Sequence, residues 1–165
     1  MKLEVHHRFD CTPEHYWEMY WHEEFDSMLN ERSTVTREII DENDDGNVLY
    51  RRLRFTPDRE LPRAASRILG STKLIYEQDN YLDRAKGVMT WEVLPTVLPG
   101  KVNAKGTFAI SAAPGGCELS VVGEVQVKLR FIGGVVEQNI VDSVKQSYEM
   151  MADVIHLHHV VWFLG

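Results

Sequence analysis

The clearest pattern of apolar and polar positions lies in the last third of the chain. Between Glu118 and Arg130 the apolar residues alternate with polar ones, which predicts a strand with one covered face and one face in water. After Gly133 the apolar residues recur every three or four positions, which predicts an amphipathic helix of some 30 residues, roughly 45 Å long. Its apolar side would carry Val136, Ile140, Val144, Tyr148, Met151, Ile155, His158 and Trp162.

Alternation and β-branched residues predict further strands upstream. With the last strand, 117–131, they make about seven, and Asp45-Gly46 is a hairpin signal between two of them. The predicted strands before the last are Leu3–Phe9, 33–41, 48–55, 71–81, 85–95 and 102–112.

Helical signals follow the first strand. Thr12 suits the N-cap, Pro13 the first helical position and Glu14 the positive end of the helix dipole. The aromatic residues that follow recur at helical spacing, and we predict two short helices with a break between Trp21 and Glu24. Residues 56–70 contain two prolines, so we predict a loop there with at most a short helical turn.

This order of elements predicts one α+β domain over residues 1–165, with an antiparallel sheet covered on one face by the long last helix. No other predicted element is long enough to cover that face. We expect Gly133 and Gly134 to provide the backbone freedom that turns the chain from the last strand onto the sheet.

Two motifs in this order carry a resemblance to a known superfamily. "FDCTPEHYWEMYW" resembles the opening, and "VKLRFIGGVVEQNIVDSV" the ending, of the START-like superfamily, also called SRPBCC, whose fold is the helix grip. Among its bacterial branches the chain is most similar to a START-like family of unknown function. The resemblance implies a curved sheet that grips the last helix with a cavity between them. Members bind sterols, phospholipids, plant hormones or polyketides there; a minority are enzymes, and some are interaction domains.

The predicted inner faces of the sheet and the helix supply the candidate cavity lining. On this basis we predict that the protein binds, sequesters or transports a hydrophobic small molecule, with a lipid as one candidate. The same residues would equally make a filled core, as in an interaction domain, and the sequence does not separate the two. The predicted lining consists of Met89, Trp91, Phe108, Ile110, Val125, Val127, Ile140, Val144, Tyr148 and Met151, together with Arg51.

Arg51 is the charged member of this set. Alternation puts it between the apolar Leu49 and Leu53, so an inward Arg51 can bind a carboxylate or phosphate head group. A strand-end arginine also commonly turns outward or pairs with an acid.

No nucleophile motif, phosphate loop or metalloprotease motif occurs in the chain. Tyr76, Glu92, Tyr148 and Arg51 could act as acid, base or oxyanion partner in a cyclase-like pocket. A polyketide cyclase or aromatase is therefore the enzyme alternative. We assign no catalytic residue and no cofactor, and favour a binding protein over an enzyme.

The C-terminal histidines raise the question of a metal. His156 and His159 are three residues apart, so they share a helix face and could hold an ion, with His158 between them. No acid or cysteine completes a recognised spacing, and histidines also suit the negative end of a helix dipole. We predict no metal site. The apolar tail "HHVVWFLG" is expected to pack against the aromatic helix "HYWEMYW" rather than contact a partner.

Composition narrows the partners. The net charge of −7 argues against nucleic acid, which needs a basic face, and no apolar run is long enough for stable membrane insertion. The N-terminus lacks the apolar segment of a signal peptide, and Cys11 and Cys117 fit no metal or redox motif, so we expect a cytoplasmic protein with two free thiols. A protein partner or a homodimer stays open.

Overall fold

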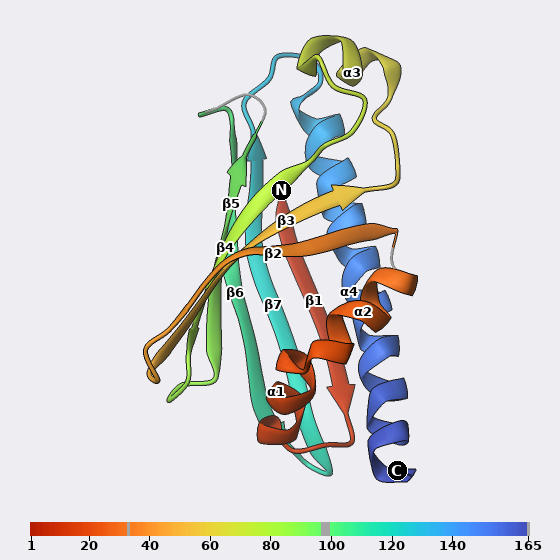
Figure 1. Ribbon diagram of the computed structural model, residues 1–165. Helices are drawn as coiled ribbons and strands as arrows, with labels where there is room; N and C mark the ends of the chain where they lie inside the picture. Colours follow the sequence, from red (N-terminus) through yellow and green to blue (C-terminus); the bar gives the residue numbers. More distant parts are fainter. Residues whose placement is uncertain (33, 97–99, 165) are drawn as a thin grey trace.

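A seven-stranded antiparallel sheet is the framework of the molecule (Figure 1). The computed structural model describes residues 1–32, 34–96 and 100–164, of which 160–164 are described by their backbone alone. In chain order the elements are β1 (Lys2–Phe9), α1 (Pro13–Trp21), α2 (Glu23–Arg32), β2 (Val35–Asp44), β3 (Val48–Pro57), α3 (Arg63–Leu69), β4 (Tyr76–Asp83), β5 (Val88–Pro95), β6 (Val102–Ala113), β7 (Gly116–Val127) and α4 (Gly133–Leu164).

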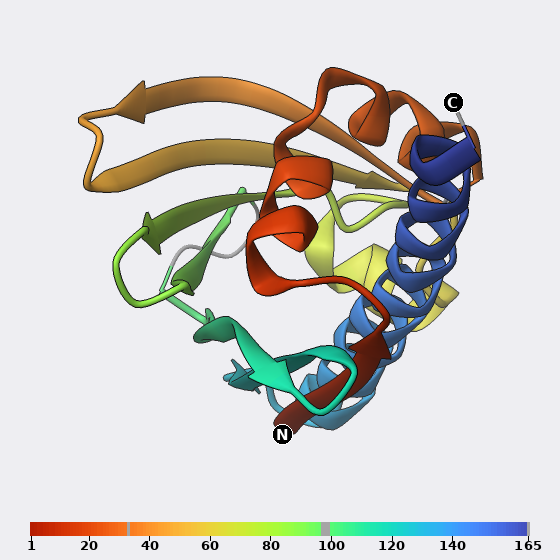
Figure 2. The same ribbon diagram turned by 90° about the horizontal axis from the view of Figure 1, so that it is seen from below.

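The strands lie in the order β1-β7-β6-β5-β4-β3-β2. From β2 to β7, each strand pairs with the next one along the chain. The exception is β1, which pairs with β7 from Lys2↔Glu124 to Phe9↔Cys117. The sheet curves, and α1, α2 and α4 lie on its concave side (Figure 2). The α+β helix-grip prediction is therefore confirmed.

Alternating burial confirms the predicted faces of the last two strands. Leu119, Val121 and Val125 of β7 are at most 1% exposed, and Phe108 of β6 is fully buried. The polar residues between them lie on the outer face. Burial of these apolar side chains beneath α4 supplies most of the free energy that holds the helix on the sheet, at about 25 cal/mol for each Å² removed from water.

The two N-terminal helices form where the sequence predicts them. The hydroxyl of Thr12 accepts a hydrogen bond from the backbone N–H of His15, and Pro13 opens α1. The helix α1 ends at Trp21, because His22 has an extended backbone. The helix α2 begins at Glu23, directly after His22. This confirms the predicted break.

The junction between β7 and α4 differs from the prediction. The chain turns at Phe131, whose φ is 67°, and Gly133 and Gly134 are already the first residues of α4. Gly133 is required for another reason: a Cβ there would come within 2.5 Å of the Val127 carbonyl oxygen. Glu137, one turn into α4, accepts a hydrogen bond of 2.8 Å from the Val127 N–H. Gly133 thus allows α4 to approach β7 closely, and the hydrogen bond to Glu137 holds the two elements together.

Two further predictions need correction. Residues 63–69, predicted as loop, form the helix α3, which follows Pro62 and ends at Gly70 with a φ of 67°. The strand predicted from residue 71 begins only at Tyr76. The apolar tail was predicted to pack against the aromatic helix. The side chains of this tail beyond residue 159, including Trp162, lie outside the described residues. In the described part of the chain, no helix combines the length and apolar character needed to cross a membrane.

Candidate ligand-binding cavity

Two small cavities lie side by side between the concave face of the sheet and α4. The first cavity has a volume of about 40 Å³ and the second about 50 Å³, so each is large enough for a few water molecules. Four side chains border both cavities and separate them: Tyr76, Gln78, Val144 and Tyr148. The two spaces are therefore neighbouring parts of one region, divided by side chains of β4 and α4.

The first cavity has an almost wholly apolar wall. It is lined by Leu3, Leu74, Ile75, Tyr76, Gln78, Trp91, Val93, Pro95, Val102, Ala104, Val125, Ile140, Val144 and Tyr148. Trp91 on β5 shapes this end, because its indole lies across the paired Gly106 and Gly123 of the two neighbouring strands. A Cβ at Gly123 would come within 2.3 Å of the Trp91 ring. The absence of side chains at the two glycines therefore makes room for Trp91, which forms part of the cavity wall.

The second cavity has a polar side. It is lined by Tyr20, Leu29, Val35, Arg37, Leu53, Phe55, Tyr76, Gln78, Asn80, Met89, Val144, Ser147, Tyr148 and Met151. Arg37 is only 5% exposed, and its Nε lies 3.0 Å from Oδ1 of Asp26. Its guanidinium also faces the rings of Tyr20 and Phe25. Within the described residues its Nη2 has no hydrogen-bond acceptor. Arg37 thus carries an unused donor in the wall of the second cavity.

The two tyrosines that separate the cavities are neutral hydrogen-bonding groups. Burial raises the pKa of both the Tyr76 and the Tyr148 phenol well above the ordinary value. Both hydroxyls therefore keep their protons at neutral pH and can donate to an oxygen atom in either cavity.

The predicted lining residues fall into four groups. Trp91, Val125 and Ile140 border the first cavity, Met89 and Met151 border the second, and Val144 and Tyr148 border both. Phe108, Ile110 and Val127 are buried but border neither cavity. Phe108 instead packs among aromatic rings, with ring centroids 5.6 Å from Trp17 and 5.6 Å from Tyr20.

Arg51 and Glu92, which were considered as polar residues of the cavity, lie outside both cavities. Arg51 borders neither cavity: its guanidinium lies 4.4 Å from the ring centre of Trp21, and its Nε pairs with the Glu42 carboxylate. Glu92 is exposed on the outer face of the sheet, where it cannot reach Tyr76 or Tyr148. The predicted acid–base set is therefore reduced to the two tyrosines.

The buried arginine that the sequence did not single out is Arg37. Val35 and Arg37 share one face of their strand, and the hairpin register brings that face onto the concave side. The same alternation also places Arg51 between Leu49 and Leu53, so this pattern alone does not separate the two arginines.

Comparison with solved structures places the fold among START-like proteins. A START superfamily protein from Mycobacterium smegmatis is 13% identical, with a TM-score of 0.61, and the match covers 93% of this chain and 96% of that one. The protein TTHA0849 from Thermus thermophilus is 11% identical, with a TM-score of 0.66 and coverage of 94% and 97%. Zhui aromatase/cyclase from Streptomyces sp. R1128 is 13% identical, with a TM-score of 0.61 and coverage of 96% and 93%. At these identities the likeness shows the fold alone.

Residues 4–157 match the family described as "Protein of unknown function (DUF2505)", and the chain belongs to that family. No curated protein matches the chain by sequence. This agrees with the expected START-like family of unknown function.

Proposed function

We propose that this protein binds and sequesters an apolar small molecule that carries an oxygen acceptor at one end, with a fatty-acid-like lipid as the first candidate. The observation that carries the proposal is the pair of adjacent cavities, one apolar and one with Arg37 in its wall. The apolar part of the ligand would occupy the first cavity, and its oxygen would accept from Arg37, Tyr76 or Tyr148 in the second.

Binding on this scale requires the two cavities to join. Pockets for small organic ligands typically have volumes of roughly 300–1,000 Å³, far above the present 40 and 50 Å³. Val144 and Tyr148 are only partly buried and border both cavities, so the cavities would join where these two side chains move apart from β4. Apolar ligand surface would then leave water at about 25 cal/mol per Å², which is the driving force of sequestration.

Arg37 favours a ligand that carries an oxygen acceptor. Its charge is already compensated by Asp26, while Nη2 still lacks an acceptor within the described residues. A carbonyl, hydroxyl or carboxyl oxygen would satisfy that donor, whereas an entirely hydrocarbon ligand would leave it buried without an acceptor.

An enzyme of the cyclase type is the second candidate, supported by the two tyrosines that border both cavities and by the similarity in fold to an aromatase/cyclase. Tyr148 would donate a proton or hydrogen bond to a carbonyl oxygen of the substrate. A Tyr148→Phe variant would then lose turnover while keeping its ligand, whereas a sequestering protein has no turnover to lose.

The first experiment is native mass spectrometry of the freshly purified protein, with organic extraction of bound molecules, followed by titration with oleic acid and with an alkane of equal length. We expect an adduct with oleic acid and none with the alkane. Val144→Trp should abolish the adduct because Val144 borders both cavities and is only half-buried. Val125 is less suitable, because it is 1% exposed and a tryptophan there would overpack the core.

Gln146→Trp is the matched control, since it adds the same side chain at an exposed position of the same helix. The double variant Asp26→Asn with Arg37→Met removes the buried ion pair as a unit and should lose the preference for the oxygen-bearing ligand. An adduct that persists in folded Val144→Trp would contradict the cavity. A clean mass with every ligand would instead indicate a filled core and an interaction domain.

A further inference from the structure

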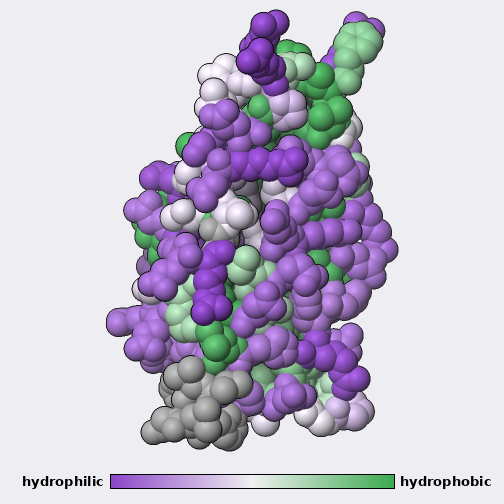
Figure 3. All heavy atoms as spheres, turned by 90° about the vertical axis from the view of Figure 1, so that its right-hand side faces the viewer, coloured by the Kyte–Doolittle hydropathy of each residue, from purple (hydrophilic) through white to green (hydrophobic). Residues whose placement is uncertain are grey.

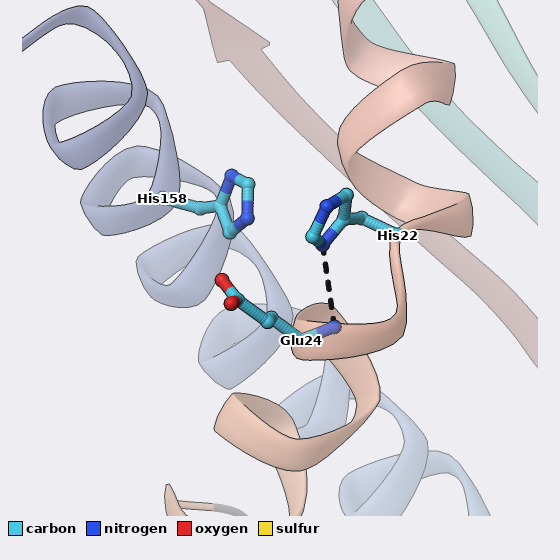
Figure 4. A group of neighbouring side chains, drawn as sticks. All are labelled: His22, Glu24 and His158. Carbon is cyan, nitrogen blue, oxygen red and sulfur yellow. Dashed lines mark hydrogen bonds between the residues drawn. The ribbon is translucent and has the colours of Figure 1, made fainter. Parts of the chain in front are cut away.

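Three potential metal ligands converge where α1 meets α2 beside the far end of α4. His22 lies in the connection between α1 and α2, Glu24 lies in the first turn of α2, and His158 projects from α4 (Figure 4). One ligand atom from each side chain lies within 4.8 Å of those of the other two. The helices thus bring together two imidazoles and a carboxylate from segments more than 130 residues apart in sequence.

The chemistry of this set suits a divalent transition-metal ion. Two histidines and one glutamate form a common three-ligand set for Zn²⁺, with water as the fourth ligand. His158 is only 4% exposed, so the surrounding side chains hold its imidazole in place beside the other two ligands. Glu24 is exposed and supplies the negative charge.

The present spacing needs a small contraction to hold an ion. Zinc bonds of about 2.0–2.1 Å put tetrahedral ligand atoms about 3.4 Å apart, compared with separations of up to 4.8 Å here. The buried His158 is fixed by its surroundings, but the half-buried His22 and the exposed Glu24 can rotate toward it. The side chains that must move are thus the ones with space to do so.

Among the described contacts of His22, the contraction gives up one weak hydrogen bond. Nδ1 of His22 accepts from the Glu24 backbone N–H at 3.3 Å, near the upper limit for such bonds. A metal at Nδ1 would replace this bond directly. A metal at Nε2 would move the proton to Nδ1, which can then no longer accept. Either way the loss is small compared with two or three metal–ligand bonds.

We propose that His22, Glu24 and His158 form a binding site for a divalent transition-metal ion of the zinc type, which fastens the α1–α2 connection to α4. The sequence analysis considered only His156 and His159 and predicted no metal site; neither of these two histidines belongs to this cluster. His156 packs against the ring of Phe9 and His159 against that of His15, on other sides of α4.

The site also has a position from which it can influence the second cavity. Tyr20 and Leu29, which line that cavity, lie on either side of His22 and Glu24 in the chain, and Met151 lies about two turns before His158 on α4. An ion at the cluster would tie both parts of the cavity wall together. The metal proposal itself does not depend on what the cavity holds.

The test is isothermal titration of the untagged, metal-free protein with ZnCl₂, together with the thermal midpoint measured with and without zinc. We expect one ion per chain and a higher midpoint with zinc, because an ion that binds only the folded state stabilises it. The variants His22→Gln and Glu24→Gln should each weaken zinc binding at least ~10-fold. Both changes are at partly or fully exposed positions, so neither should prevent folding.

The matched control is His156→Gln, which removes an exposed histidine from the same helix and should leave zinc affinity unchanged. Titration with CoCl₂ gives a second readout, since visible absorption of the bound ion reports its ligand geometry and should be lost in His22→Gln. No zinc binding by the untagged protein, or binding that both cluster variants leave intact, would overturn the proposal.

Discussion

At the scale of single residues, Asp79 on β4 has the best-defined ion pair of the sheet. Arg52 on β3 donates two hydrogen bonds to its carboxylate, of 2.8 and 3.0 Å, and the Tyr50 hydroxyl donates a third of 2.9 Å. The Asp79 side chain is 13% exposed. Hydrogen bonding from Arg52 lowers the pKa of Asp79 below its ordinary value of 3.8. The charged carboxylate therefore stabilises the pairing of these strands.

This arrangement predicts a stability difference that depends on pH. Because the pKa of Asp79 is lower in the folded state, its contribution is fully present above the unfolded value and disappears as the pH falls through the folded value. Asp79→Asn should lower the free energy of unfolding by about 1–2 kcal/mol near neutral pH, and by progressively less as the pH falls below about 4.

Urea denaturation of both proteins from about pH 7 to about pH 3 measures this difference. Asp153→Asn, at an exposed position of α4, serves as the control and should change little at any pH. A gap between wild type and Asp79→Asn that stays constant over the whole range would contradict the assignment.

Residue-level chemistry was also the least predictable part of the candidate site. Arg37 and Arg51 both lie on β-strands with apolar neighbours, and periodicity gives them the same inward orientation. What separates them is the contact each guanidinium makes: Asp26 and two rings beside the cavity for Arg37, Trp21 and Glu42 for Arg51. Those contacts depend on where α1 and α2 lie on the sheet, which no local pattern specifies.

At the scale of elements, the connection from β7 to α4 depends on an unusual backbone conformation. Phe131 has a φ of 67° and is 97% exposed, so its ring gains nothing from packing while its backbone carries the cost of a left-handed conformation. For residues with a Cβ that cost is roughly 1–2 kcal/mol, and asparagine tolerates the conformation better than most.

Phe131→Asn should therefore raise the free energy of unfolding by about 1 kcal/mol, measured by urea denaturation. Arg130→Asn is the neighbouring control: it changes an exposed residue of the same connection that has an ordinary backbone, and we expect no gain from it. If Phe131→Asn were no more stable than wild type, the turn would not be strained at this residue.

Local patterns predicted most elements but not how they meet. Alternation gave the faces of β6 and β7, and Thr12-Pro13 gave the start of α1, because those signals depend on neighbours in sequence. The helix α3 was predicted only as a short helical turn within a loop, although Pro62 before it and Gly70 after it are ordinary boundary residues. Gly133 was predicted to provide backbone freedom at the turn, whereas it allows the close approach of α4 to Val127. That approach is a tertiary contact, which a local pattern does not show.

At the scale of the whole molecule, the sheet is not equally protected along its width. The outer part of β2 from Glu38 onward is mostly exposed, and the β2–β3 hairpin reaches beyond the region that the helices cover (Figure 2). Strands β6 and β7, by contrast, have neighbours on both sides and bury alternate residues almost completely. The molecular surface beside α4 is mostly polar, with scattered apolar residues (Figure 3).

We expect amide hydrogen exchange to follow this difference. Peptides spanning residues 41–47 should exchange fastest among the strand peptides, and those from β6 and β7 slowest, because opening the central strands requires more of the core to unfold. Mass spectrometry of one digest measures exchange in the hairpin peptides and in the β6 and β7 peptides together. The β6 and β7 peptides therefore serve as the internal reference. Equal protection in the two regions would show that the sheet opens only as a whole.

The order of strands is a global feature that periodicity does not contain. Alternation is the same whichever neighbour a strand has, so the position of β1 beside β7 was not predicted from the sequence. The resemblance to START-like proteins gave the curved sheet and the covering helix correctly, and it gave no particular ligand.

The pairing of β1 with β7 also means that β1 cannot pair until most of the chain has been synthesised on the ribosome. Partners such as Phe9 and Cys117 are separated by 108 residues, and Lys2 and Glu124 by 122. At about 5–20 residues per second, the first strand waits roughly 5–25 s for its partner strand to be made. Until then β1 has no strand to pair with, although the strands from β2 to β6 are already made. The beginning of this nascent chain therefore stays unpaired longer than the end.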